Sequence, residues 1–195
     1  MPTFTTTLRV RSLLGLASGV TVYDELLDTL VDVADAIVFD EINLPASSGG
    51  TITAFSESFD IHVAGQKDLA VNYVPLVNVV AMTFGGTNGS LVASDDYYVT
   101  DYGQVRLIPD GSYYPAGRQI VNITYTAGFA SIPSDLSHAA TLIAVHHFNE
   151  GPHVGFQTEK LGTYNYKLAN LGQGMGMPSI ANRILAKYKR VFARP

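Results

Sequence analysis

The chain has 195 residues, of which 47% are hydrophobic and 15% charged, so it can bury one core of ordinary size or two interleaved ones. Its net charge of −5 disfavours general binding to nucleic acid, which needs clustered Lys and Arg. The absence of cysteine excludes disulfides, thiolate catalysis and zinc–thiolate sites. No apolar run approaches the roughly 18 residues of a membrane span, so we expect a soluble protein made in the cytoplasm.

Residues 21–44 predict the first long helix. Apolar side chains recur there at spacings of three and four, which is the pattern of an amphipathic helix. These side chains are Val22, Leu26, Leu27, Leu30, Val31, Ala34, Ile37 and Val38. Thr21 and Asp24 resemble a capping pair at its start, and Pro45 followed by Gly49 and Gly50 ends it.

Between residues 51 and 129 the apolar period changes to two, which predicts half-buried antiparallel strands. Phe55, Phe59 and Ile61 alternate with polar residues, as do Val121 and Ile123 further on. Residues 97–100 and 104–108 flank a turn and predict a hairpin. We expect five to seven strands in this region.

Two more helices follow the strands. One begins after Pro133 at Ser134 and ends near Gly151; the other opens at Pro178-Ser179. For the last helix we expect Ile180, Ile184, Tyr188 and Val191 on one face and Arg183, Lys187, Arg190 and Arg194 on another. The glycine-rich segment between the helices predicts a long loop.

Together these elements predict an α+β fold. A small bundle of three main helices, built from residues 1–50 and 130–195 with an extended loop at 151–177, carries an inserted antiparallel β lobe at 51–129. The reason is that each helical segment is too short to bury its apolar stripe alone.

Charge is placed unevenly along the chain. Seven acids and no base lie between Asp24 and Glu41, whereas five bases and no acid lie between Arg183 and Arg194. Like charges at helical spacing cost about 0.2–0.5 kcal/mol per pair, so the acids do not serve to stabilise their helix. The two faces are either solvated or paired within one subunit, or they meet across a subunit boundary or a partner interface, as in a head-to-tail ring.

Candidate catalytic and metal-binding residues are few. His146 and Glu150 lie four apart and could share a metal with His138, His147 or His153, but the spacing is not H-E-x-x-H. Residues 172–176 hold three glycines, yet no strand precedes them and no Gly-Lys-Ser/Thr follows. No G-x-S-x-G is present. We therefore expect no enzyme activity, no cofactor and no metal.

Several segments, taken in order, resemble the head-to-tail connector proteins (neck adaptor or head completion proteins) of tailed bacteriophages. They cover residues 21–195 and are Tyr23–Leu30, Pro75–Val80, Asp96–Val99, Val121–Phe129, Pro133–Ala139 and Glu159–Tyr166. The last contains the family's E-x-x-G-x-Y-x-Y pattern, with Tyr164 and Tyr166, before a basic closing helix. The large β segment departs from the smaller, nearly all-helical members of the family.

The resemblance implies a structural virion protein, assembled in the host cytoplasm, that forms a homo-oligomeric ring of about a dozen subunits in the neck. It implies a portal protein above the ring, a tail or stopper protein below, and DNA that passes through the channel without sequence-specific binding. The portal or subunit interface would involve Arg183, Lys187, Arg190, Arg194, Tyr164, Tyr166, Asp24, Asp28 and Asp32. The alternatives are another tail-completion or fibre-attachment protein, and a β-sandwich glycan-binding module or hydrolase.

Overall fold

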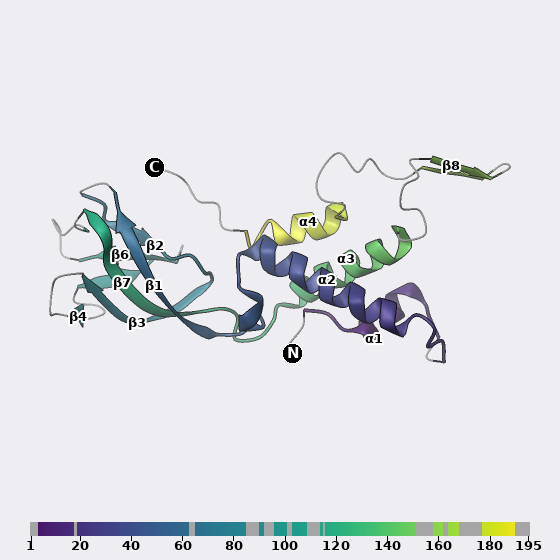
Figure 1. The fold of residues 1–195 in the computed structure, drawn as a ribbon, viewed down its shortest axis with the longest axis horizontal. Helices are drawn as coiled ribbons and strands as arrows, with labels where there is room; N and C mark the ends of the chain where they lie inside the picture. The colour runs from purple at the N-terminus through teal and green to yellow at the C-terminus, as the bar shows by residue number, and fades with distance from the viewer. Residues whose placement is uncertain are drawn as a thin grey trace. The chain divides into compact units, whose positions relative to one another are not determined.

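The computed structural model describes residues 4–17, 19–62, 65–84, 90–91, 96–100, 103–108, 114, 116–150, 158–161, 164–167 and 177–189. The chain divides into two compact units: a helical unit, Met1–Ile42 with Ile132–Pro195, and a sheet unit, Asn43–Ser131 (Figure 1). The predicted α+β class is confirmed. The unit boundaries lie closer to the flanking helices than the expected 50/51 and 129/130.

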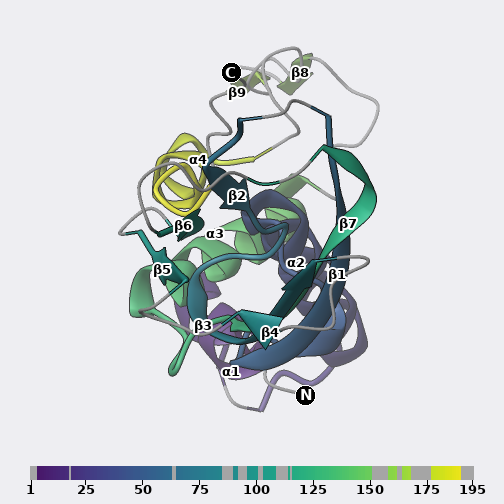
Figure 2. The same cartoon turned by 90° about the vertical axis from the view of Figure 1, so that its left-hand side faces the viewer.

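The helical unit contains α1 (Thr7–Leu14), α2 (Asp24–Ile42), α3 (Ser134–Glu150) and α4 (Ser179–Leu185). Helix α3 packs against each of the other three (Figure 2). Its first three turns bury small side chains, Ala139, Ala140 and Ala144, which let the neighbouring helices approach closely. Fully buried Leu27 and Ile143 each contribute about 1.5–3 kcal/mol of hydrophobic stabilisation.

Helix α1 is not among the elements that the sequence pattern predicts. It has eight residues, and Val10 is its one fully buried side chain. The hydroxyl of Thr6 caps its start by accepting from the backbone N–H of Arg9 at 3.4 Å, and Gly15 ends it in the left-handed region, with φ of 68°. Helix α1 is therefore defined by its caps and by packing against α2 and α3 rather than by an apolar period.

The buried face of α4 differs from the expected one. Ala181 and Leu185 are fully buried, whereas Ile180 is 51% exposed and Ile184 is half-buried. The hydroxyl of Tyr188 donates a 2.6 Å hydrogen bond to Asp135 of α3, which fixes the rotation of the final turns. Ile180, Ile184 and Tyr188 keep the expected four-residue spacing, but the fully buried side chains are those of the adjacent Ala181 and Leu185; Val191 lies outside the described residues.

The sheet unit contains seven strands in two antiparallel sheets, which confirms the expected number. The larger sheet has the order β1-β7-β3-β4, and the smaller has the order β2-β6-β5. Their bounds are β1 Thr53–Ile61, β2 Asp68–Ala70, β3 Leu76–Phe84, β4 Ser90–Leu91, β5 Tyr97–Val99, β6 Gln104–Leu107 and β7 Gly117–Ala127. The predicted hairpin is the β5–β6 pair, in which Val99 faces Val105.

A single apolar cluster fills the sheet unit. The larger sheet contributes Met82, Val121 and Ile123, and the smaller contributes Leu69 and Val105, all nearly inaccessible to solvent. Exposed and half-buried residues alternate along β1, as the sequence period predicts. On the outer face of the larger sheet, Ser56 and Ser58 of β1 and Asn122 of β7 are exposed, as are Val77 and Val80 of β3.

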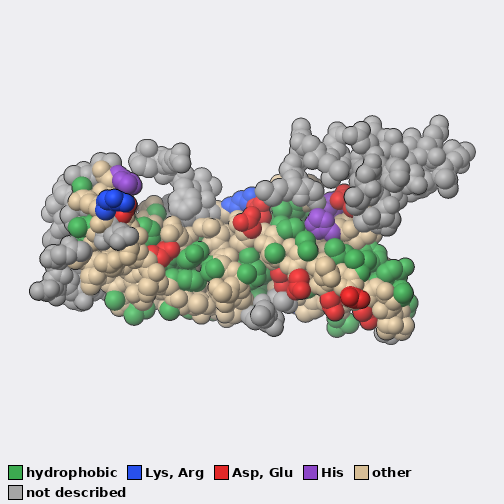
Figure 3. Space-filling view, in the orientation of Figure 1, with side chains coloured by type: hydrophobic (Ala, Val, Ile, Leu, Met, Phe, Trp, Pro, Cys, Tyr) green, Lys and Arg blue, Asp and Glu red, His purple; other side chains and the backbone are tan. Residues whose placement is uncertain are grey.

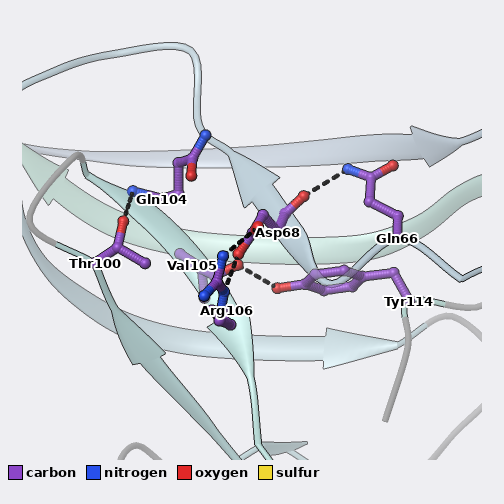
Figure 4. Close-up of polar contacts among 7 residues, drawn as sticks. All are labelled: Gln66, Asp68, Thr100, Gln104, Val105, Arg106 and Tyr114. Carbon is purple, nitrogen blue, oxygen red and sulfur yellow. Dashed lines mark hydrogen bonds and ion pairs between the residues drawn. The ribbon is translucent and has the colours of Figure 1, made fainter. Parts of the chain in front are cut away.

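A polar cluster fastens the smaller sheet (Figure 4). Arg106 of β6 forms a two-pronged ion pair with Asp68 of β2, with N···O distances of 2.5 and 2.7 Å, and holds the pKa of that carboxyl below its ordinary value. The buried hydroxyl of Tyr114 donates to the carbonyl of Val105 at 3.0 Å. Because these polar groups bond to one another, we interpret the cluster as one that stabilises the smaller sheet.

The two ends of the sheet unit meet at a β-bridge. Thr51 pairs with Phe129, and the N–H of Phe129 donates to the carbonyl of Gly50 at 3.1 Å. Gly128 stands beside this bridge with φ of 122°, and a Cβ there would lie 2.2 Å from the Thr51 carbonyl oxygen. Only glycine fits this position.

The segment 151–177, expected as an extended loop, contains two short strands, β8 (Thr158–Leu161) and β9 (Tyr164–Lys167). They pair as an antiparallel hairpin in which Glu159 faces Tyr166. In the described part of the chain, no helix combines the length and the apolar character that crossing a membrane requires.

Candidate interaction surface of the helical unit

Helix α2 carries apolar side chains on two faces. One face, with Leu27, Val31, Ala34, Val38 and Ile42, is buried in the helical unit. The second face points to solvent and is called here the α2 stripe. It consists of Val22, which lies just before the helix, and Leu26, Leu30, Val33 and Ile37.

The α2 stripe is substantially open. Val22 is 79% exposed, Leu26 is 48% exposed and Val33 is 40% exposed, while Leu30 and Ile37 are half-buried. Their spacings of four, four, three and four place them on one side of the helix. A continuous apolar strip of this kind on a helix surface is typical of an interaction site.

Acidic side chains border the stripe, and hydrophobic and acidic groups lie side by side over α2 in Figure 3. Asp24 pairs with Arg11 of α1, and Asp28 accepts a 2.5 Å hydrogen bond from the hydroxyl of Thr7. Asp32 is exposed and forms no ion pair with another described residue. Of the three predicted acids, two are thus held against α1 and the third is available at the surface.

Asp35, one of the seven acids between Asp24 and Glu41, is buried, with 5% of its surface exposed. One carboxylate oxygen accepts from the backbone N–H of Thr5 at 3.3 Å, and the other has no hydrogen-bond partner. Burial raises the pKa of Asp35 to about 6. This carboxylate therefore belongs to the interior and not to the acidic surface.

The basic residues at the end of the chain lie on the exposed side of α4. Arg183 is exposed and forms no ion pair with a described residue, and the ammonium of Lys187 lies 4.0 Å from the carboxylate of Asp135. Ile180 shares this side, so the exposed face of α4, defined as Ile180, Arg183 and Lys187, is apolar and cationic together. Arg190 and Arg194 lie outside the described residues.

Within the subunit, the predicted acidic and basic sets meet at one point among the described residues. Helix α3 packs against both α2 and α4, and Figure 2 shows these two on different sides of it. Among the described residues, one ion pair joins the two sets, between Glu41 and Lys189. Tyr164 and Tyr166, the remaining predicted residues, belong to strand β9.

The described histidines do not form a metal site. His146 and Glu150 lie 3.1 Å apart as an ion pair on α3, and His138 is exposed. The Nε2 atom of His147 is buried without a partner, and burial together with neighbouring His146 lowers its pKa. No group of three His, Cys, Asp or Glu side chains suited to a metal exists among the residues that the structure describes.

A shallow depression on the outer face of the larger sheet offers no reactive group. Its lining includes Ser56 and Ser58, whose hydroxyls bond to Thr124 and Asn122 of β7 at 3.0 and 2.6 Å. Glu57 contributes the one carboxylate of this lining, and it is engaged by the hydroxyl of Tyr125 at 2.6 Å. The most developed surface feature of the described chain is therefore the pair of helix faces on α2 and α4.

Exposed helix faces that combine apolar and charged side chains are typical of proteins that act by contact with other protein. The chain belongs to the head completion protein family, whose sequence model it matches over residues 3–191. This confirms the resemblance to phage connector proteins and makes the chain a structural virion protein. No curated relative matches the sequence at a significant level.

Several chains of known structure share the fold, and three of them are described here. One, from "Virion of native gene transfer agent (GTA) particle", has a TM-score of 0.55 and 18% identity and covers 96% of this chain and 91% of its own length. One from "Neck of empty GTA particle computed with C6 symmetry" has a TM-score of 0.50, 17% identity and coverages of 96% and 91%. One from "Neck of native GTA particle computed with C12 symmetry" has a TM-score of 0.50, 16% identity and coverages of 87% and 85%.

Proposed function

We propose that this protein is a connector in the neck of a tailed particle, where a ring of its copies lies beneath the portal and joins the DNA-filled head to the tail. The observation that carries the proposal is the family match over residues 3–191, in combination with a fold shared along 96% of the chain with a neck protein. The role is mechanical and needs no catalysis.

A closed ring is the assembly we favour, with about a dozen copies. The necks whose chains share this fold are described with C6 and C12 symmetry. In the present chain, Asp32 of α2 and Arg183 of α4 are exposed without an ion pair to a described residue, and exposed opposite charges on one molecule suit head-to-tail contact.

We assign the remaining contacts of the proposed ring to regions of the chain. The C-terminal part, with Arg183, Lys187, Arg190 and Arg194 and with Tyr164 and Tyr166 of the hairpin segment, supplies contacts to the portal or the next subunit. The opposite end of the ring presents a surface to a tail or stopper protein. DNA crosses the channel without base readout, in keeping with a net charge of −5. The helical body and the lobe at 51–129 act as separate domains.

Deletion of the gene in cells that produce the particles tests this role. Electron microscopy should show DNA-filled heads that lack tails, and the intact gene supplied in trans should restore tailed particles. Tailed particles that are complete but fail to attach to their host would instead indicate a fibre-attachment protein. Fully infectious particles from the deletion would overturn the proposal.

A further inference from the structure

Among the described residues of the helical unit, the α2 stripe is a run of apolar side chains that stays open to solvent. Val22, Leu26 and Val33 each expose at least 40% of their surface, although the opposite face of the same helix is completely buried. Exposed Val and Leu at helical spacing forgo the roughly 25 cal/mol per Å² that burial would contribute. A second helix laid along the stripe would recover it.

Charge identifies the chemistry of the missing partner. Asp32 and Glu25 are exposed along one border of the stripe, and no base lies between Asp24 and Glu41 to neutralise them. The partner should therefore combine an apolar side chain with cations on one helix face. The exposed face of α4 and of the turn that follows it has this composition, with Ile180 51% exposed on the same side as Arg183 and Lys187.

Within one subunit these faces are kept apart. Helix α3 lies against both helices and α4 also contacts α2, but no ion pair among the described residues joins Asp32 or Glu25 to Arg183 or Lys187. Two complementary surfaces on different sides of one molecule cannot satisfy each other internally, but they can do so between copies related by rotation.

We propose that the α2 stripe of one copy receives the exposed face of α4 of the next copy, and that this contact is the repeating interface of the ring. Leu26 and Val33 pack against Ile180, and Asp32 and Glu25 face Arg183 and Lys187. The inference rests on the proposed neck function and names the surfaces that close the ring. Because the interface joins two different surfaces, it propagates around a ring instead of ending at a dimer.

Cysteine cross-linking tests this pairing cleanly, because the natural chain contains no cysteine. Particles are produced with the full-length double variant Leu26→Cys/Ile180→Cys, treated with a short bismaleimide and resolved under denaturing conditions. We expect a ladder of species that rises from dimer to closed ring. The controls are each single variant and the pair Val80→Cys/Ile180→Cys, since Val80 is an exposed apolar residue of the sheet unit.

The outcomes of this experiment distinguish failure of the proposed interface from failure of the proposed neck function. A ladder confined to Leu26→Cys/Ile180→Cys supports the interface, whereas no cross-link in particles that contain the protein overturns it. Dimers from Leu26→Cys alone would show two α2 stripes facing each other and also overturn it. Absence of the chain from purified particles would contradict the neck function itself.

Exchanging the charges of Asp32 and Arg183 gives a second test of the proposed pairing. Asp32→Arg and Arg183→Glu should each lower the yield of tailed particles at least tenfold, and the double variant should recover most of the loss. Failure of the double variant to exceed either single variant would contradict the proposed pairing.

Discussion

The backbone N–H of Thr5 donates a 3.3 Å hydrogen bond to the buried carboxylate of Asp35 in α2. Beside this bond the ring of Phe4 meets Phe39 edge-on, with 4.7 Å between centroids, and the hydroxyl of Thr5 lies 2.7 Å from that of Thr141 in α3. The start of the chain is thereby held between two helices. The cost of this arrangement is a buried carboxylate whose second oxygen has no hydrogen-bond partner.

Stability should therefore depend on pH through Asp35. Its pKa is about 6 in the folded protein, against an ordinary value of 3.8. Between about pH 4 and 6 the folded state holds more protons than the unfolded state, so the free energy of unfolding falls as pH rises, by about 3 kcal/mol in total. Above this window the contribution is constant.

The variant Asp35→Asn should flatten this dependence, because the amide oxygen can still accept from Thr5 but no charge is buried. Urea unfolding followed by helical circular dichroism from pH 4 to 7.5 measures the effect. Asp40→Asn, an exposed change on the same helix, is the control and should retain the wild-type slope. Equal slopes for Asp35→Asn and the wild type would contradict the prediction.

Replacing Gly128 should disrupt the β-bridge between Thr51 and Phe129, where the two ends of the sheet unit meet. In Gly128→Ala the new Cβ meets the Thr51 carbonyl oxygen at 2.2 Å at a φ of 122°, so we expect a loss of more than about 3 kcal/mol. Gly19→Ala is the matched control, because nothing lies within 4 Å of its Cβ, and it should change stability by less than about 0.5 kcal/mol. Similar unfolding midpoints for the two variants would refute this account.

Loss of the Tyr125 hydroxyl should weaken the larger sheet. The hydroxyl donates to Glu57 at 2.6 Å and accepts from the N–H of Tyr73 at 3.2 Å. Tyr125→Phe leaves both groups without this partner, which should cost about 1–3 kcal/mol. Tyr23→Phe, an exposed tyrosine of the helical unit, serves as control in the same denaturant titration. The idea fails if the two phenylalanine variants are equally stable.

Reversing the charge of the last helix should impair assembly of the particle while leaving the subunit folded. With Arg183, Lys187 and Arg190 all changed to Glu, we expect a folded monomer with near-native thermal stability that no longer supports attachment of tails to heads. The physical reason is repulsion at a surface that opposes acids. Arg118→Glu, on the exposed side of β7, should leave attachment unchanged. Normal yields of tailed particles from the triple variant would disprove the assignment.

The strands could be predicted from the sequence where the period of two is regular, as it is along β1; in β3, bulges interrupt the alternation. Phe55, Phe59 and Ile61 contact the core from the side that alternation predicts. The long helices α2 and α3 were equally clear. Helix α1 could not be found in this way, because one buried residue, Val10, defines no period and its stability comes from tertiary contacts.

The sequence predicted the charged residues of the candidate surface but did not predict which apolar residues of α2 are exposed. A helix with apolar residues around more than half of its circumference shows no preference for which side is covered, so Leu26 and Leu27 are equivalent in the sequence. The structure exposes the first and buries the second. Asp35 was expected at the surface for the same reason, since only packing against Thr5 reveals that it turns inward.

The bridge between Thr51 and Phe129 gives the seven-strand lobe a narrow base, since its entering and leaving chains are already adjacent. Such a lobe can be lengthened, exchanged or removed by editing between two neighbouring points, without changing the path from α2 into α3. The lobe can therefore vary among relatives while the helices that carry the candidate interaction surface stay unchanged.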